Sequence, residues 1–151
     1  MRESPEIKER VLKSYRLMLD FYGLQLTDEL TGQLERTQGY ASRYRNLTRS
    51  SHNYLRISRI LKHLSIMDFE HLGAGLLLHF LSEQSEHGAV NSDGLCSSMD
   101  RWWSNCLRNK ADRDWIRDKI HGVRRGEKSF SRADYVAALQ RRKDTGSYET
   151  S

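Results

Sequence analysis

The spacing of apolar positions predicts an amphipathic helix at the start of the chain. Ser4 is a residue type that caps helices, and Pro5 suits the first helical position, where its missing N–H costs nothing. At 3.6 residues per turn, the apolar side chains that follow fall within an arc of about 80°. They are Ile7, Val11, Tyr15, Met18 and Tyr22. Gly23 is expected to end this helix.

The next segment has a different pattern. Leu24, Leu26 and Leu34 alternate with polar residues on either side of the pair Thr31-Gly32. This alternation around a turn favours a short β-hairpin. Residues 39–49 are then expected to form a short helix.

The stretch "SHNYLRISRILKHLSIMDFEHLGAGLLLHFL" predicts two helices of different character. Ser51 is expected to cap the first, which has one apolar face, and Asp68 is expected to cap the second. Residues 69–81 are apolar around most of the circumference, as in a buried central helix. Gly73 and Gly75 would allow neighbouring elements to approach this helix closely.

The remaining pattern completes a helical bundle. After a polar loop at 85–94, the apolar residues predict a helix over 95–106 and another around 115–123. Ser131, with Asp134 three residues later, predicts a capped last helix over 133–142. The expected fold is all-α, a compact bundle of about six or seven helices with a small β-hairpin after the first. We expect one domain over residues 1–143 and a disordered tail over 144–151.

Composition narrows the class of protein without identifying it. The 151 residues fit one domain, the net charge is +5, and proline occurs once. The longest apolar run, 72–81, is about half of the ~20 residues that a membrane-spanning helix needs. No signal peptide is visible at the start of the sequence, so we expect an intracellular protein for which peripheral membrane association stays open. Cys96 and Cys106, on one predicted helix, would lie about 15 Å apart, too far for a disulfide.

The sequence carries no recognised signature of catalysis. No glycine-rich phosphate loop is present, and no local motif supplies a nucleophile with its base. His63, His71, His79 and His87 recur every eight residues, a step of about 80° and 12 Å along a helix, so they do not converge on one ion. We expect neither an enzyme nor a cofactor or metal site.

Basic residues on the third helix offer one candidate surface. Arg56, Arg59 and Lys62 lie away from its apolar face. A stripe of this kind can contact nucleic-acid phosphates or an acidic protein. No recognised DNA-binding motif accompanies it, so a solvated face is the favoured interpretation and nucleic acid the less favoured partner.

The dipeptide Trp102-Trp103 offers a second candidate surface. Adjacent helical positions diverge by about 100°, so the two rings are not expected to share one face. One is expected to enter the core and the other to lie at a groove or a subunit contact, where aromatic anchors contribute most to binding.

Several segments together resemble a known family. They are "LKSYRLMLDFYGLQL", "TGQLER", "RYRNL", "SHNYLRISRILKHLSIMDFEHL" and "LLLHFL". In order and spacing, residues 11–81 are similar to the conserved region of the opioid growth factor receptor and its receptor-like paralogue. The likeness continues more weakly over 95–117. Relatives have further segments on both sides, so we interpret the chain as a truncated form, with an alternative start or a partial gene model as the other interpretations.

The resemblance implies a non-enzymatic helical domain that binds the pentapeptide Met-enkephalin. It also implies a nuclear or perinuclear location and a role in restraining cell proliferation. The ligand has a free amine and two aromatic rings, so we expect an acidic group and an aromatic groove. The candidate ligand-binding residues are Asp20, Tyr22, Trp102 and Trp103. The alternative is a regulatory scaffold that binds protein or nucleic acid through the basic face of the third helix.

Overall fold

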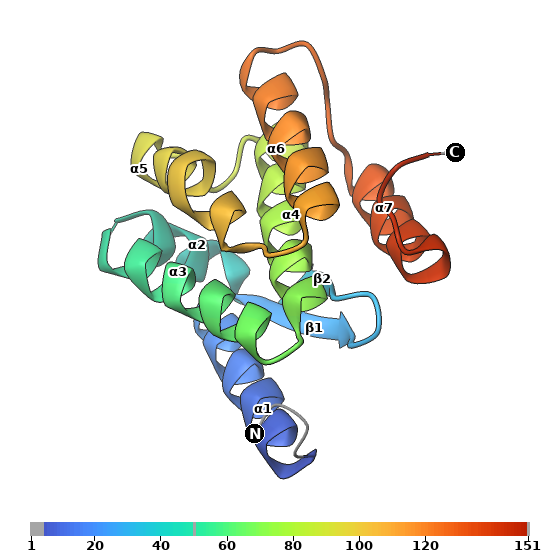
Figure 1. The fold of residues 1–151 in the computed structure, drawn as a ribbon. Coiled ribbons are helices and arrows are strands. Elements are labelled where there is room, and N and C mark those ends of the chain that lie inside the picture. The colour runs from blue at the N-terminus through green and yellow to red at the C-terminus, as the bar shows by residue number, and fades with distance from the viewer. Residues whose placement is uncertain (1–4, 50, 151) are drawn as a thin grey trace.

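The computed structural model describes residues 5–49 and 51–150, with the backbone alone for Ser51. Two strands follow the first helix, and helices form the rest (Figure 1). The first part contains α1 (Pro5–Phe21), β1 (Leu24–Asp28), β2 (Gln33–Arg36), α2 (Tyr40–Arg49), α3 (Ser51–Ile66) and α4 (Glu70–His87). The second part contains α5 (Asp93–Ser98), η1 (Met99–Trp103), η2 (Ser104–Cys106), α6 (Lys110–Arg124) and α7 (Arg132–Thr145). The predicted all-α bundle with a small hairpin after the first helix is confirmed.

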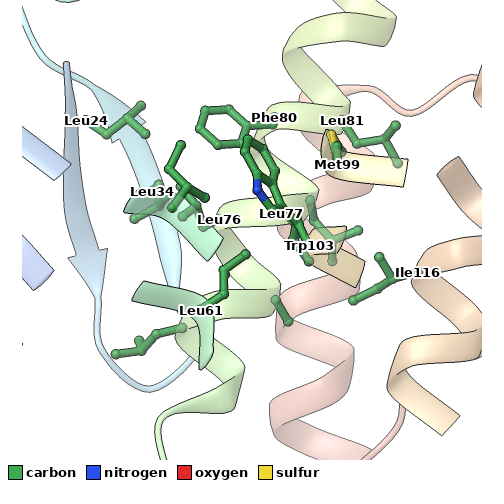
Figure 2. Close-up of a cluster of buried hydrophobic side chains, with 14 of the residues drawn as sticks. Leu24, Leu34, Leu61, Leu76, Leu77, Phe80, Leu81, Met99, Trp103 and Ile116 are labelled. Carbon is green, nitrogen blue, oxygen red and sulfur yellow. The ribbon is translucent and has the colours of Figure 1, made fainter. Parts of the chain in front are cut away.

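The core is organised around α4, as the apolar pattern predicts. All side chains from Leu72 to Gln84 are buried. Figure 2 shows side chains from the hairpin, α3, η1 and α6 gathered around this helix. They include Leu24, Leu34, Leu61, Met99, Trp103 and Ile116. Removal of this apolar surface from water is the main driving force for the bundle.

The hairpin packs unusually close to α4, through two glycines. β1 and β2 pair antiparallel, and Gly32 in the connecting turn has a φ of +85°, which favours glycine. A Cβ atom placed on Gly75 would overlap the carbonyl oxygen of Gly32. At Gly73, a Cβ would lie 3.1 Å from the Leu61 side chain. The prediction that these two glycines permit close packing is confirmed.

Asp68 does not have its predicted role as a helix N-cap. It takes a left-handed φ of +65°, and the N-cap position of α4 is occupied by Phe69, whose side chain makes no capping hydrogen bond. The backbone N–H of Phe69 donates to the oxygen of Leu64 over 2.8 Å, which closes the end of α3. The sharp turn between the helices therefore uses Asp68 as the left-handed residue that ends α3. The capping roles predicted for Ser4 and for the Ser51 side chain fall outside the described residues.

The predicted helix over 95–106 is divided into three helical types. An α-helical turn over 93–98 widens into a π-helix and then tightens into a 3-10 turn that ends at Cys106. Cys96 and Cys106 are free thiols.

The predicted cap of the last helix is confirmed. Ser131 and Asp134 form a reciprocal capping box at the start of α7.

The end of the chain differs from the expected disordered tail. Helix α7 continues to Thr145, and Tyr148 is 2% exposed. The Tyr148 ring stacks on Trp115 with centroids 5.1 Å apart, and Arg141 donates to the Tyr148 carbonyl oxygen over 2.7 Å. One buried aromatic residue therefore holds a polar segment against α6.

Within the described residues, no helix is both long enough and apolar enough to cross a bilayer.

Candidate functional site

A surface groove lies between α3 and the segment formed by α5, η1 and η2. Its volume is about 640 Å³, within the range of small-ligand sites. Helix α3 contributes one wall, with Tyr54, Leu55, Ser58 and Lys62. The opposite wall consists of Ser98, Trp102, Asn105 and Cys106. We call this cavity the Trp102 groove.

The two adjacent tryptophans have opposite environments. Trp103 is fully buried and packs against Phe80, with ring centroids 5.8 Å apart. Trp102 is 64% exposed and lies on the wall of the groove. The prediction that one ring enters the core and the other lies at a groove is confirmed. The buried Trp103 side chain anchors η1 to the core. The Trp102 side chain next to it is therefore held at the surface.

The walls of the groove are joined by hydrogen bonds between side chains and backbone. The Trp103 indole N–H donates to the backbone carbonyl oxygen of Tyr54 over 3.2 Å. The Ser65 hydroxyl donates to the backbone carbonyl oxygen of Cys106 over 2.8 Å. The Tyr54 hydroxyl also donates to the oxygen of Thr48 in α2 over 3.1 Å. The bonds from Trp103 and Ser65 hold the two walls together without a ligand, and the bond from Tyr54 fixes the α3 wall to α2, so little ordering is needed on binding.

The surface of the groove is mostly apolar, with one formal charge. Leu55, 60% exposed, and Trp102 supply the large apolar side chains. Among the described residues that line the groove, Lys62 alone is charged. Burial raises the pKa of the Cys106 thiol, and the charge of Lys62 partly offsets this, so Cys106 lines the groove in its neutral form. The groove can hold apolar side chains next to an anionic group.

The other candidate ligand-binding residues do not line this groove. Asp20 and Tyr22 lie at the end of α1 and in the residue after it, and Trp103 lies beneath the surface. Tyr22 is buried, and its hydroxyl has no hydrogen-bond partner among the described residues. Burial raises the pKa of Tyr22, while Arg56 lowers it to a smaller extent. The structure therefore brings Trp102 to a cavity and leaves Asp20 and Tyr22 elsewhere.

The three basic candidates on α3 are exposed, and each has different neighbours. Lys62 lies at the Trp102 groove, whereas Arg59 lines a smaller cavity of about 210 Å³ between α1 and α3. Arg56 lies close enough to Tyr22 to influence its pKa. Binding through this face stays a prediction.

A buried polar cluster on α4 was not foreseen from the sequence. Glu83 accepts two hydrogen bonds from Arg36, of 2.7 and 3.0 Å, and one of 2.7 Å from the Tyr44 hydroxyl. Nε2 of His79 lies 3.0 Å from the Tyr44 oxygen, and its Nδ1 lies 3.4 Å from a guanidinium nitrogen of Arg132. His79 is 1% exposed and Glu83 is 6% exposed.

The hydrogen bonds of this cluster determine the state of His79. The single hydroxyl proton of Tyr44 goes to Glu83, so Nε2 of His79 must be the donor to the Tyr44 oxygen. Nδ1 is then free to accept from Arg132. Burial lowers the pKa of His79 to about 4, so the ring is neutral at physiological pH. Each polar group has a partner, and we interpret the cluster as structural.

The fold and the groove define an all-α domain with a preformed, largely apolar surface site. The family model described as the opioid growth factor receptor conserved region matches residues 1–136, and the chain belongs to this family. The opioid growth factor receptors of Homo sapiens and Mus musculus are 49% and 48% identical to it over 82 residues, 54% of this chain. The opioid growth factor receptor-like protein 1 of Xenopus tropicalis is 38% identical over the same length.

The matched segment is a small part of each relative. It covers 12% of the Homo sapiens receptor, 13% of the Mus musculus receptor and 16% of the Xenopus tropicalis protein. No solved structure matches the chain.

Proposed function

We propose that the chain is a non-enzymatic receptor domain that binds a short opioid peptide, of the Met-enkephalin type, in the Trp102 groove. The observation that carries this proposal is the pairing of exposed Trp102 with exposed Leu55 across a preformed cavity of about 640 Å³. Aromatic and aliphatic side chains of a peptide would bury against these two residues. The names of the relatives support an opioid peptide as the ligand.

The cellular part of this proposal rests on membership of the family alone. A receptor domain of this kind would act at nuclear or perinuclear sites and contribute to restraint of cell proliferation. A protein whose groove is blocked should then lose that effect while keeping its location.

Replacement of Trp102 by alanine tests the proposed site. We expect Met-enkephalin to give saturable heat with the wild-type chain in isothermal titration calorimetry, and W102A to bind at least about tenfold more weakly, as for a central aromatic anchor. The matched control is L17A, which removes a comparably exposed apolar side chain (66% exposed) away from the groove. Helicity of W102A should be unchanged, because its ring lies mostly in solvent.

Protection of a thiol can locate the bound peptide. Cys106 lines the groove and Cys96 does not, so the peptide should slow alkylation of Cys106 alone, measured by mass spectrometry. Absence of saturable heat with the wild-type chain, or equal affinity of W102A, would remove the proposal. If ligand binding instead depended on Arg56 and Arg59 and weakened steeply with salt, the scaffold alternative would be favoured.

A further inference from the structure

We propose that the Trp102 groove recognises the carboxylate end of its peptide, through Lys62, and leaves the amino end in solvent. This inference rests on the proposed function and specifies which end of the ligand is bound. It differs from the expectation that an acidic residue of the protein would hold the peptide amine.

The direction of the groove follows from the contacts between its walls. Tyr54, Ser58 and Lys62 are spaced four residues apart on one face of α3, so this wall extends about 12 Å. At one end, the Trp103 indole N–H donates to the backbone oxygen of Tyr54. Further along α3, the Cys106 thiol contacts the backbone oxygen of Ser58 over 3.9 Å. Both walls therefore run in the same direction, with Lys62 at the end that holds Cys106.

The length of the groove fits a short extended peptide. A chain advances about 3.3 Å per residue, so the wall of about 12 Å accommodates three to four residues. A terminal carboxylate beside Lys62 would place the preceding side chains near Leu55 and Trp102, which are the apolar parts of the groove.

The distribution of charge selects the carboxylate over the amine. Lys62 is exposed, and within the described part of the chain no carboxylate forms an ion pair with it. Its ammonium group can therefore donate to an incoming carboxylate, and such charge-assisted bonds are stronger than neutral ones. The eight described residues that line the groove include no acidic side chain, so a peptide amine would have no countercharge there and would be repelled by Lys62.

The test compares three forms of one peptide by calorimetry at low salt. They are Met-enkephalin with both ends free, the same peptide with a C-terminal amide, and the same peptide with an acetylated amino end. We expect the amide to bind about three- to tenfold more weakly than the free acid. The acetylated form should match the free acid within about twofold, and added salt should reduce the difference between acid and amide.

Substitution of Lys62 assigns the effect to one residue. K62Q should bind the acid and the amide equally. The control R59Q removes one positive charge from the same exposed helix but not from this groove, so it should keep the wild-type preference. Equal wild-type affinity for acid and amide, or loss of affinity on acetylation, would overturn the inference while leaving the proposed peptide site standing. No binding of any of the three peptides would remove both.

Discussion

Replacement of Gly75 by alanine is expected to destabilise the protein by about 3 kcal/mol or more, a large part of the 5–15 kcal/mol typical of a domain. The added methyl group would overlap the backbone of Gly32, in the turn of the hairpin. Overpacking commonly costs about 1–3 kcal/mol when side chains can adjust. Here a backbone carbonyl must move, so the hairpin must separate from α4. Urea unfolding followed by circular dichroism measures the loss.

Two other glycines provide matched controls for this substitution. G39A changes a turn position where an added Cβ meets nothing within 4 Å, so its unfolding free energy should stay within about 0.5 kcal/mol of wild type. G73A should fall between the two, because its Cβ would meet a movable side-chain methyl of Leu61. A G75A variant as stable as G39A would contradict the close approach of the hairpin to α4.

Stability is expected to fall by about 3 kcal/mol as the pH drops from about 6.5 to about 4, because His79 is buried in its neutral form. Burial lowers its pKa from the usual 6.5 to about 4. Between these values the unfolded chain binds a proton at this histidine and the folded chain does not, so lower pH favours unfolding. The charges of Arg132 and Arg36 also disfavour protonation, whereas Glu83 favours it to a lesser extent than burial opposes it.

The variant H79Q separates this contribution from the others. It removes the titrating group, so the dependence of unfolding free energy on pH between about 6.5 and 4 should become shallower, although the variant is less stable at pH 7 because glutamine does not reproduce the packing of the His79 ring against Tyr135. The control H121Q changes an exposed histidine of α6 and should keep the wild-type slope.

Glu83 adds a separate loss of stability at lower pH. Burial raises its pKa, but hydrogen bonds from Arg36 and Tyr44 outweigh this and lower it, so its stabilising effect disappears as pH falls through the lowered value.

One outcome would contradict the prediction for His79. If the unfolding free energy of the wild-type protein does not change between pH 6.5 and 4.5, His79 is not buried as a neutral ring.

The fold could be predicted wherever a local pattern was long enough to carry information. Helix α4 was recognisable because apolar residues surround it, and its glycines pointed to close packing. The π-helical turn at 99–103 was not, because five residues show no distinct period. Its geometry depends on how Trp103 enters the core, which is a tertiary effect. Asp68 was misread because an aspartate between two helices fits both the end of one and the start of the next.

Only part of the candidate site was visible in the sequence. That one of Trp102 and Trp103 is buried and the other exposed follows from helical geometry alone, so it could be predicted. The placement of Leu55 and Lys62 opposite Trp102 depends on how α3 packs against η1, and no local signal encodes it. His79 and Glu83, four residues apart in an apolar helix, were a detectable sign of a buried polar cluster. Their partners come from distant segments and could not be named.

The contrast between the two neighbouring indoles makes the protein its own optical reporter. The enclosed ring of Trp103 should emit at shorter wavelengths and resist aqueous quenchers, whereas the open ring of Trp102 should emit further to the red and be quenched readily. Trp115, which is partly buried against Tyr148, contributes a third emitter away from the groove. A ligand that covers the open ring would therefore shift the emission to the blue without any label, and fluorescence alone could follow its arrival in real time.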